Sequence, residues 1–198
     1  MVQRAGARHA ACRQASAVLI GPGMQDQAAS IALVRSLLPD CVGAMLILDA
    51  GAMCMVRGGW RFEQAVLLTP HAGELACLTG IGKPDIKAEA AAADAAQRWQ
   101  AIVALKGART VIAAPDGRRW LHQGGNTGLA ISGSGDVLAG LIAGLAARGT
   151  TLEQAAAWGV ALHAMAGEQL SLRHGPLGYL AREISAEVPA LLRALASD

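Results

Sequence analysis

The segment GNTGLAISGSGDVLAGLIAG (residues 125–144) places a glycine-rich turn directly before an apolar run long enough for a helix. The first N–H groups of a helix lack partners within it and lie at the positive end of its dipole, so a turn of Gly133, Ser134 and Gly135 would let a phosphate approach them. Asp136 then falls in the first helical turn, where its carboxylate can accept a proton from a substrate hydroxyl. This pairing predicts phosphoryl transfer to a hydroxyl. An ordinary N-cap with a flexible lead-in is the alternative.

The apolar run that follows covers residues 137–147 without interruption. A helix that is apolar all round is typical of a buried helix, and this one is too short to cross a bilayer. We therefore expect it to be buried on all sides, with its N-terminus opening from the core into a cleft.

Earlier in the chain, short apolar runs alternate with longer segments of helical periodicity. This alternation predicts an α/β sheet whose parallel strands are buried between helices. The predicted strands are residues 17–20, 44–48, 65–68 and 102–105, and the predicted helices between them are residues 27–38, 73–78 and 87–100. Residues 110–113 and 119–122 flank Pro115-Asp116-Gly117 and predict a β-hairpin. Three helices are expected after it, at residues 136–148, 152–171 and 180–196.

Polar residues follow the predicted parallel strands, where open α/β sheets bind ligands. They are Gly21-Pro22-Gly23, Asp49, the segment from Thr69 to Glu74, and the segment from Lys106 to Thr110. Together they predict one cleft. Each also has a structural interpretation: the glycines as a turn, Asp49 as a cap, His71 as a hydrogen-bonded loop residue, Glu74 as a first-turn residue that complements the helix dipole, and Lys106 as a snorkelling side chain.

Composition narrows the class of protein. The chain has 198 residues, of which 53% are hydrophobic and 16% charged, which is typical of a single globular domain and excludes disorder. A net charge of +2 and only 3% aromatic residues favour neither nucleic acid nor an anionic membrane as partner. The four cysteines lack zinc spacing, and residues 1–13 lack the apolar core of a secretory signal. We expect a cytoplasmic protein with no membrane anchor and no dedicated metal ligands.

The motifs GPG, LDA, TPHAGE, LKGARTVI and GNTGLAISGSGDVLAGLIAGL occur in this order. Together they resemble the ADP/ATP-dependent (S)-NAD(P)H-hydrate dehydratase family of the ribokinase-like superfamily, from about residue 18 to the C-terminus. The resemblance implies a three-layer α/β fold with a mainly parallel central sheet, and a single nucleotide-binding domain over residues 1–198. It also implies that a substantial N-terminal segment, usual in the family, is missing from this chain.

The resemblance implies a lyase of cofactor repair. Such an enzyme dehydrates the S epimer of NADH or NADPH hydrate with ADP, or ATP, as phosphoryl donor and Mg²⁺ on the nucleotide, and ADP would yield AMP and phosphate. Asp136 would be the catalytic base, and Gly23, His71 and Asp136 would contact the hydrate. The nucleotide would contact Lys106, Gly107, Ala108, Arg109, Thr110, Gly133, Ser134 and Gly135, with Asp49, Glu74 and Asn126 as further cleft residues. A homo-oligomer is expected.

Two alternatives remain open. A ribokinase-like small-molecule kinase would share the base but stop at a phosphorylated product, although Asn is usual there in place of His71. A catalytically impaired nucleotide-binding protein is the second alternative. It is consistent with the missing N-terminal segment and with Asp49-Ala50-Gly51, where the family usually has a second aspartate.

Overall fold

The computed structural model describes residues 5–81 and 88–196 and contains a six-stranded sheet in the order β1-β2-β3-β4-β5-β6. The first four strands are mutually parallel, and β5 and β6 are added in antiparallel orientation. The strands are β1 (Ala17–Ile20), β2 (Met45–Leu48), β3 (Val66–Leu68), β4 (Ile102–Leu105), β5 (Arg109–Ala113) and β6 (Arg119–Gln123). The predicted mainly parallel α/β sheet and its hairpin are confirmed.

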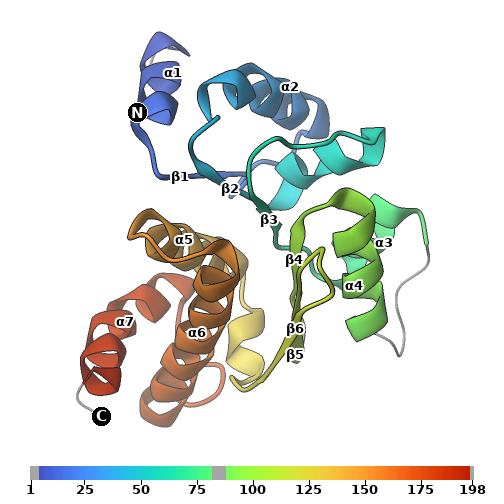
Figure 1. Ribbon diagram of the computed structural model, residues 1–198. Coiled ribbons are helices and arrows are strands. Elements are labelled where there is room, and N and C mark those ends of the chain that lie inside the picture. Colours follow the sequence, from blue (N-terminus) through green and yellow to red (C-terminus); the bar gives the residue numbers. More distant parts are fainter. Residues whose placement is uncertain (1–4, 82–87, 197–198) are drawn as a thin grey trace.

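Helices cover both faces of the sheet, which makes three layers (Figure 1). One outer layer contains α1 (Ala5–Gln14), α2 (Gln27–Leu37), α3 (Ala72–Thr79) and α4 (Ala88–Trp99), with the 3₁₀ segments η1 (Leu38–Asp40) and η2 (Ala50–Gly58). The other contains α5 (Ser134–Ala147) and α6 (Leu152–His174), with α7 (Ala181–Leu195) packed against them and η3 (Thr127–Ala130) leading into α5.

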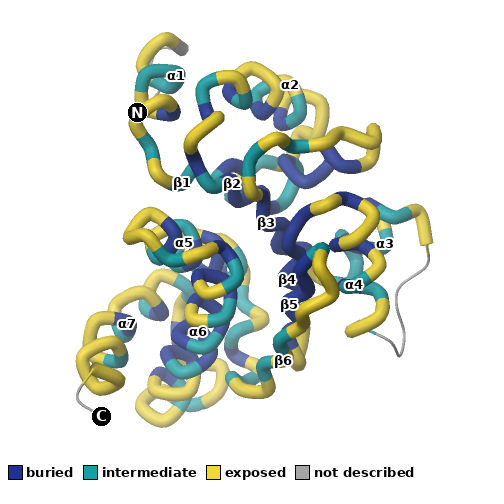
Figure 2. Tube along the Cα trace, viewed as in Figure 1, coloured by how far each residue is buried: buried dark blue, intermediate teal, exposed yellow. Residues whose placement is uncertain are grey.

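Residues on the central strands alternate between the two layers. Leu46 and Leu48 belong to the core beneath α2 to α4, whereas Ile47 lies between them in sequence and packs in the core beneath α5 and α6. All three side chains are fully buried, because successive strand residues point to opposite faces and both faces are covered by helices. Figure 2 shows this buried centre with the exposed residues on the outer helix surfaces.

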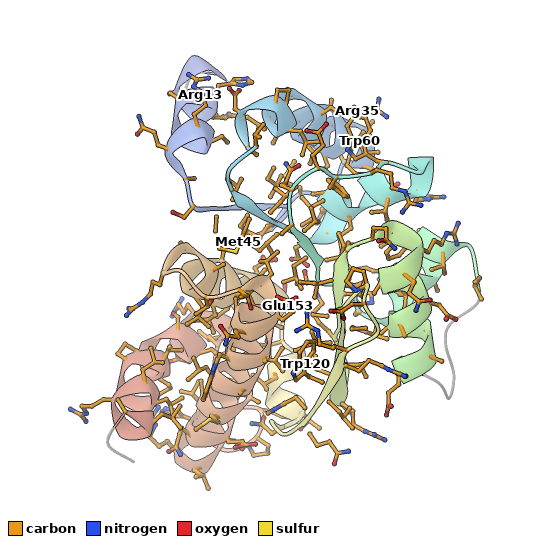
Figure 3. The ribbon with its side chains drawn as sticks, in the orientation of Figure 1. Arg13, Arg35, Met45, Trp60, Trp120 and Glu153 are labelled. Carbon is orange, nitrogen blue, oxygen red and sulfur yellow. The ribbon has the colours of Figure 1, made fainter. Side chains whose placement is uncertain are left out.

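The hairpin is fixed to the α5–α6 layer at its edge. The Arg118 guanidinium donates to Glu153 at the start of α6 over 3.0 Å, and it also stacks on Trp120 at 5.5 Å from the ring centre. Glu153 and Trp120 lie at this junction in Figure 3, far from Arg35 and Trp60, which stack at the same distance on the other layer. The hairpin therefore forms a wall next to the C-terminal helices.

The prediction that residues 137–147 are buried on all sides is wrong. In α5, Leu138, Ile142 and Ala146 are buried, whereas Gly140 and Gly144 on the opposite side are exposed. The apolar character of the outer side comes from glycine and alanine, which contribute little apolar surface, so an all-apolar sequence does not require burial all round.

Other predicted helices are confirmed to within a few residues, and the largest difference is α6, which continues to His174 instead of ending at residue 171. The sequence did not predict α1, η1, η2 or η3. Lys87, the predicted first residue of one helix, and residues 1–4 lie outside the described residues. Within the described residues, none of the helices combines the length and apolarity needed to cross a membrane.

Candidate functional site

The carboxyl ends of the parallel strands bring three predicted residues together. Asp49 follows β2 and is only 2% exposed, and its Oδ1 accepts a hydrogen bond from the Thr69 hydroxyl at 2.7 Å. Lys106, which follows β4, places its Nζ 3.1 Å from the same oxygen. Asp49 is the N-cap residue of η2, but its side chain makes no capping hydrogen bond there. Because a buried carboxylate needs a charged or hydrogen-bonded partner, this pair fixes Lys106 at the edge of the sheet.

The neighbouring strand ends are packed as closely as backbone allows. A Cβ at Gly21 would lie 1.9 Å from the carbonyl oxygen of Asp49, and Gly21 has φ +133°. Any side chain at this position would displace the chain after β2, so the glycine of the first turn is required by packing against Asp49.

Helix α5 begins at this edge without a side-chain cap. Gly133 is its N-cap residue, at φ +84° in the left-handed region that favours glycine. Ser134 donates its N–H to the Ile131 carbonyl and Val137 to the Gly133 carbonyl, which leaves the N–H groups of Gly135 and Asp136 without an acceptor in the described part of the chain. This is the arrangement that binds an anion at a helix start.

Helix α3 begins near the start of α5, but side chains accept hydrogen bonds from its first turn. His71 Nδ1 accepts hydrogen bonds from the N–H groups of Gly73 at 3.0 Å and Glu74 at 3.2 Å, and the Glu74 carboxylate accepts from the His71 N–H at 2.8 Å. This capping box satisfies the N–H groups of Gly73 and Glu74 in the first turn of α3. The His71 ring remains 59% exposed, so its other nitrogen can still meet a ligand.

A cavity of about 790 Å³ runs along the start of α5 between the hairpin and α6. Its wall contains eight of the predicted site residues, namely His71, Lys106, Gly107, Ala108, Thr110, Asn126, Ser134 and Gly135. Apolar side chains from η3 and α6, among them Leu129 and Val160, complete it. A mostly apolar cavity with a few polar groups in its wall is typical of a site for a small molecule.

Other predicted residues lie outside this wall. Arg109 pairs with Glu89 of α4 at 3.5 Å, and both side chains are more than half exposed. Asp136 is exposed in the first turn of α5, next to Gly135. Glu74 lines a second cavity of about 270 Å³ with Met24 and Gln25, which follow the Gly23 turn. Asp136 lines neither of these two cavities, and the roles of all the site residues stay predictions.

Asn126 forms part of the lead-in to α5. Its Oδ1 accepts from the Gly128 N–H at 2.8 Å and from the Tyr179 hydroxyl at 2.9 Å. Burial raises the pKa of Tyr179, against the opposing effect of the Asn126 hydrogen bond. The Asn126 Nδ2 is buried and lacks a partner in the described part of the chain, although the residue lines the cavity. It is a donor that a ligand could satisfy.

Sequence reasoning missed His163. This residue of α6 is 8% exposed and lines the cavity. Its Nε2 lies 3.0 Å from the Ser134 hydroxyl and 3.1 Å from the Ser134 carbonyl oxygen. The pKa of His163 is lowered to about 4, chiefly by burial and to a smaller extent by the nearby Lys106 ammonium, against the opposing effect of the Ser134 hydrogen bond. The available signal was a histidine within the apolar run GVALHAMAG, which needs a buried partner.

The donor set does not form a metal site by itself. No group of three or more His, Cys, Asp or Glu side chains gathers in residues 5–81 and 88–196 in a way that could hold an ion. Asp49, the buried acid at the strand ends, is paired with Lys106. A magnesium ion fits this site only as part of a nucleotide, coordinated mainly by the phosphate oxygens.

The family model described as NAD(P)H-hydrate dehydratase matches residues 1–190. The chain belongs to the NAD(P)H-hydrate dehydratase family. The match begins at residue 1, earlier than the start near residue 18 indicated by the motifs. An ADP-dependent (S)-NAD(P)H-hydrate dehydratase of Xanthomonas campestris is 48% identical over 187 residues, which is 92% of this chain and 63% of that protein.

Solved structures agree with this family membership. The ADP/ATP-dependent NAD(P)H-hydrate dehydratase of Bacillus subtilis, co-crystallized with ATP/Mg²⁺ and soaked with CoA, matches with a TM-score of 0.80 and 32% identity, over 92% of this chain and 70% of that one. A ribokinase-like superfamily protein of Enterococcus faecalis matches with a TM-score of 0.82 and 28% identity, over 94% and 66%. The predicted ribokinase-like fold is confirmed. The chain spans less than two thirds of the length of its Xanthomonas relative.

Proposed function

We propose that this NAD(P)H-hydrate dehydratase family member dehydrates the S epimer of NADH or NADPH hydrate with ADP as phosphoryl donor. The observation that carries the proposal is the open start of α5. The Gly135 N–H group lacks an acceptor in the described part of the chain, and Gly135, Ser134 and Lys106 all line the 790 Å³ cavity. Asp136, whose N–H group is also unsatisfied, lies in the same helical turn.

The cavity would hold the adenine nucleotide with its base among the apolar residues and its phosphates at α5. Lys106 supports this orientation because its Nζ lies 3.3 Å from where a Cβ of Gly135 would be, which places the ammonium beside the start of α5. Backbone donors and a lysine that neutralise the transferring phosphoryl group are the main means by which proteins catalyse such transfers. Mg²⁺ would arrive on the nucleotide and neutralise its phosphates.

Asp136 would take the proton of the C6 hydroxyl while that oxygen attacks the terminal phosphorus of ADP. The bond to the bridging oxygen breaks and AMP leaves. The ring nitrogen's lone pair then expels phosphate from C6, and transfer of the C5 proton to water restores the dihydropyridine. Only the first step needs a base next to the phosphate site, which agrees with the position of Asp136 beside Gly135.

The test is recovery of absorbance at the reduced-nicotinamide band from purified NADH hydrate or NADPH hydrate, with Mg²⁺ and either ADP or ATP. We expect recovery that requires a nucleotide and falls at least about 10³-fold in Asp136→Ala, with ADP affinity within about threefold of wild type. Recovery by the variant at the wild-type rate would refute the role of Asp136. A phosphorylated product without recovered absorbance would support a kinase, and ADP binding without turnover an impaired protein.

A further inference from the structure

The hydrogen bonds between His163 and Ser134 have only one consistent arrangement. Nε2 of His163 contacts both the hydroxyl and the carbonyl oxygen of Ser134. A carbonyl oxygen can only accept, so Nε2 must carry the proton. The His163 Nε2–H group therefore donates to Ser134. Because this nitrogen carries a proton, it cannot accept a hydrogen bond from the Ser134 hydroxyl. The Ser134 hydroxyl hydrogen is left to point elsewhere.

The direction available to that hydrogen is the cavity. Ser134, Gly135 and Lys106 all line the cavity, and the Lys106 ammonium lies beside Gly135, whose N–H group has no acceptor in the described part of the chain. All of these groups are donors. A hydroxyl held from behind by His163 adds one more donor at the position where an anion would be bound.

The packing of α6 keeps His163 at this distance. A Cβ at Gly159 would lie 2.5 Å from Ile142 of α5, and a Cβ at Gly167 would lie 2.6 Å from Leu129 of η3. These two glycines stand one turn before and one turn after His163, and they let α6 approach both segments closely. The ring is therefore fixed from both sides, as a group that orients another must be.

His163 donates without adding charge. Its pKa of about 4 keeps the ring neutral near neutral pH, and Lys106 is one cause of that low value. A permanently charged residue here would need a second buried counter-charge, whereas neutral imidazole needs only the two Ser134 contacts.

We infer that His163 is a positioning residue that turns the Ser134 hydroxyl toward a phosphate group bound at the start of α5. The inference rests on the proposed function, because that function supplies the phosphate. A purely structural role, in which His163 only fills space between α5 and α6, is the competing interpretation.

The two interpretations differ in a double-mutant cycle on ligand binding. We would measure the affinity of ADP and of adenosine by calorimetry for wild type, His163→Met, Ser134→Ala and the double variant. His163→Gln restores an N–H donor at similar reach. His174→Leu is the matched control, because His174 is an exposed histidine in the last turn of the same helix.

We expect His163→Met and Ser134→Ala each to weaken ADP binding about tenfold, which is the usual effect of losing one charge-assisted hydrogen bond. The affinity for adenosine should change less than about twofold. His163→Met should cause almost no further loss in the Ser134→Ala background. His163→Gln should recover most of the ADP affinity, and His174→Leu should bind like wild type.

Additive losses, or equal losses for ADP and adenosine, would overturn the positioning role and leave the proposed function standing. If His163→Met does not fold, the comparison rests on Ser134→Ala, and wild-type ADP affinity in that variant overturns the inference. Wild-type protein that binds neither ligand would instead overturn the nucleotide site of the proposed function, so the two failures are distinguishable.

Discussion

Helices α3 and α5 begin at the same edge of the sheet with the same pattern, a small residue, a glycine and an acid: Ala72-Gly73-Glu74 and Ser134-Gly135-Asp136. They differ at the residue before. His71 closes α3 by accepting from both free N–H groups, whereas Gly133 has no side chain and leaves those of α5 open. The acidic residues differ in the same way. The Glu74 carboxylate accepts a hydrogen bond from the His71 N–H, whereas the Asp136 side chain is exposed.

A helix start can bind an anion when no side chain of the protein accepts hydrogen bonds from its first N–H groups. The histidines next to the two helix starts also have opposite hydrogen-bonding roles. His71 accepts from α3, while His163 donates to the first residue of α5. As an acceptor, His71 occupies the first N–H groups of α3. As a donor, His163 leaves the first N–H groups of α5 free to bind a ligand.

Lys106 lies between the two helix starts, so its removal should have the largest effect. Its Nζ is 3.1 Å from Asp49 and 3.8 Å from Glu74. We expect Lys106→Met to lower the free energy of unfolding by about 3 kcal/mol, because the buried Asp49 loses its partner. Urea unfolding measures this change. ADP affinity should also fall about 100-fold, as expected when a phosphate loses its cation.

The two effects of Lys106→Met are separable. In Asp49→Asn/Lys106→Met no buried carboxylate remains unpaired, so most of the stability should return while ADP affinity stays low. Equal stability in the single and double variants would contradict the role assigned to the Asp49–Lys106 pair.

Stability should depend on pH through His163. Because the folded pKa of about 4 lies below the usual 6.5, the unfolded chain binds this proton more readily. The stabilisation that neutral His163 contributes is fully present above about pH 6.5. As the pH falls toward 4, the free energy of unfolding decreases by up to about 3 kcal/mol. Urea unfolding near pH 7 and near pH 4.5 should show wild type losing more than His163→Gln. Parallel losses would mean that His163 is protonated as easily in the fold as outside it.

Closing α5 with a charge should make it resemble α3. Gly133→Asp places a carboxylate over the free N–H groups, and Asp tolerates the left-handed region better than most residues. A Cβ there meets only Ala181 at 3.4 Å, an ordinary contact. We expect ADP affinity to fall about tenfold, because the new charge competes with the phosphate. Gly133→Asn, the neutral control of the same shape, should lose clearly less. Equal losses would indicate backbone strain instead of electrostatics.

The sequence predicted the parts of this site that depend on local pattern. Glycines before Asp136 indicated an open helix start, and polar residues after buried strands indicated one edge, where Asp49 and Lys106 do meet. It could not predict which helix start is closed, since His71 as cap depends on side-chain geometry. Nor could it pair His163 with Ser134, because their contact spans 29 positions and arises from the packing of α6 on α5.

The smallest expected effect is at the closed helix start. His71→Ala removes the acceptor for Gly73 and Glu74 N–H, and we expect the free energy of unfolding to fall by about 1 kcal/mol, the usual value of an N-cap. His71→Asn, another good N-cap residue, should restore most of this loss in urea unfolding. Because ADP would bind at α5, its affinity should change less than that of the dinucleotide hydrate. An ADP affinity that falls as far in His71→Ala as in Lys106→Met would show that the phosphates also reach α3, and the contrast between a closed and an open helix start would no longer explain where the nucleotide binds.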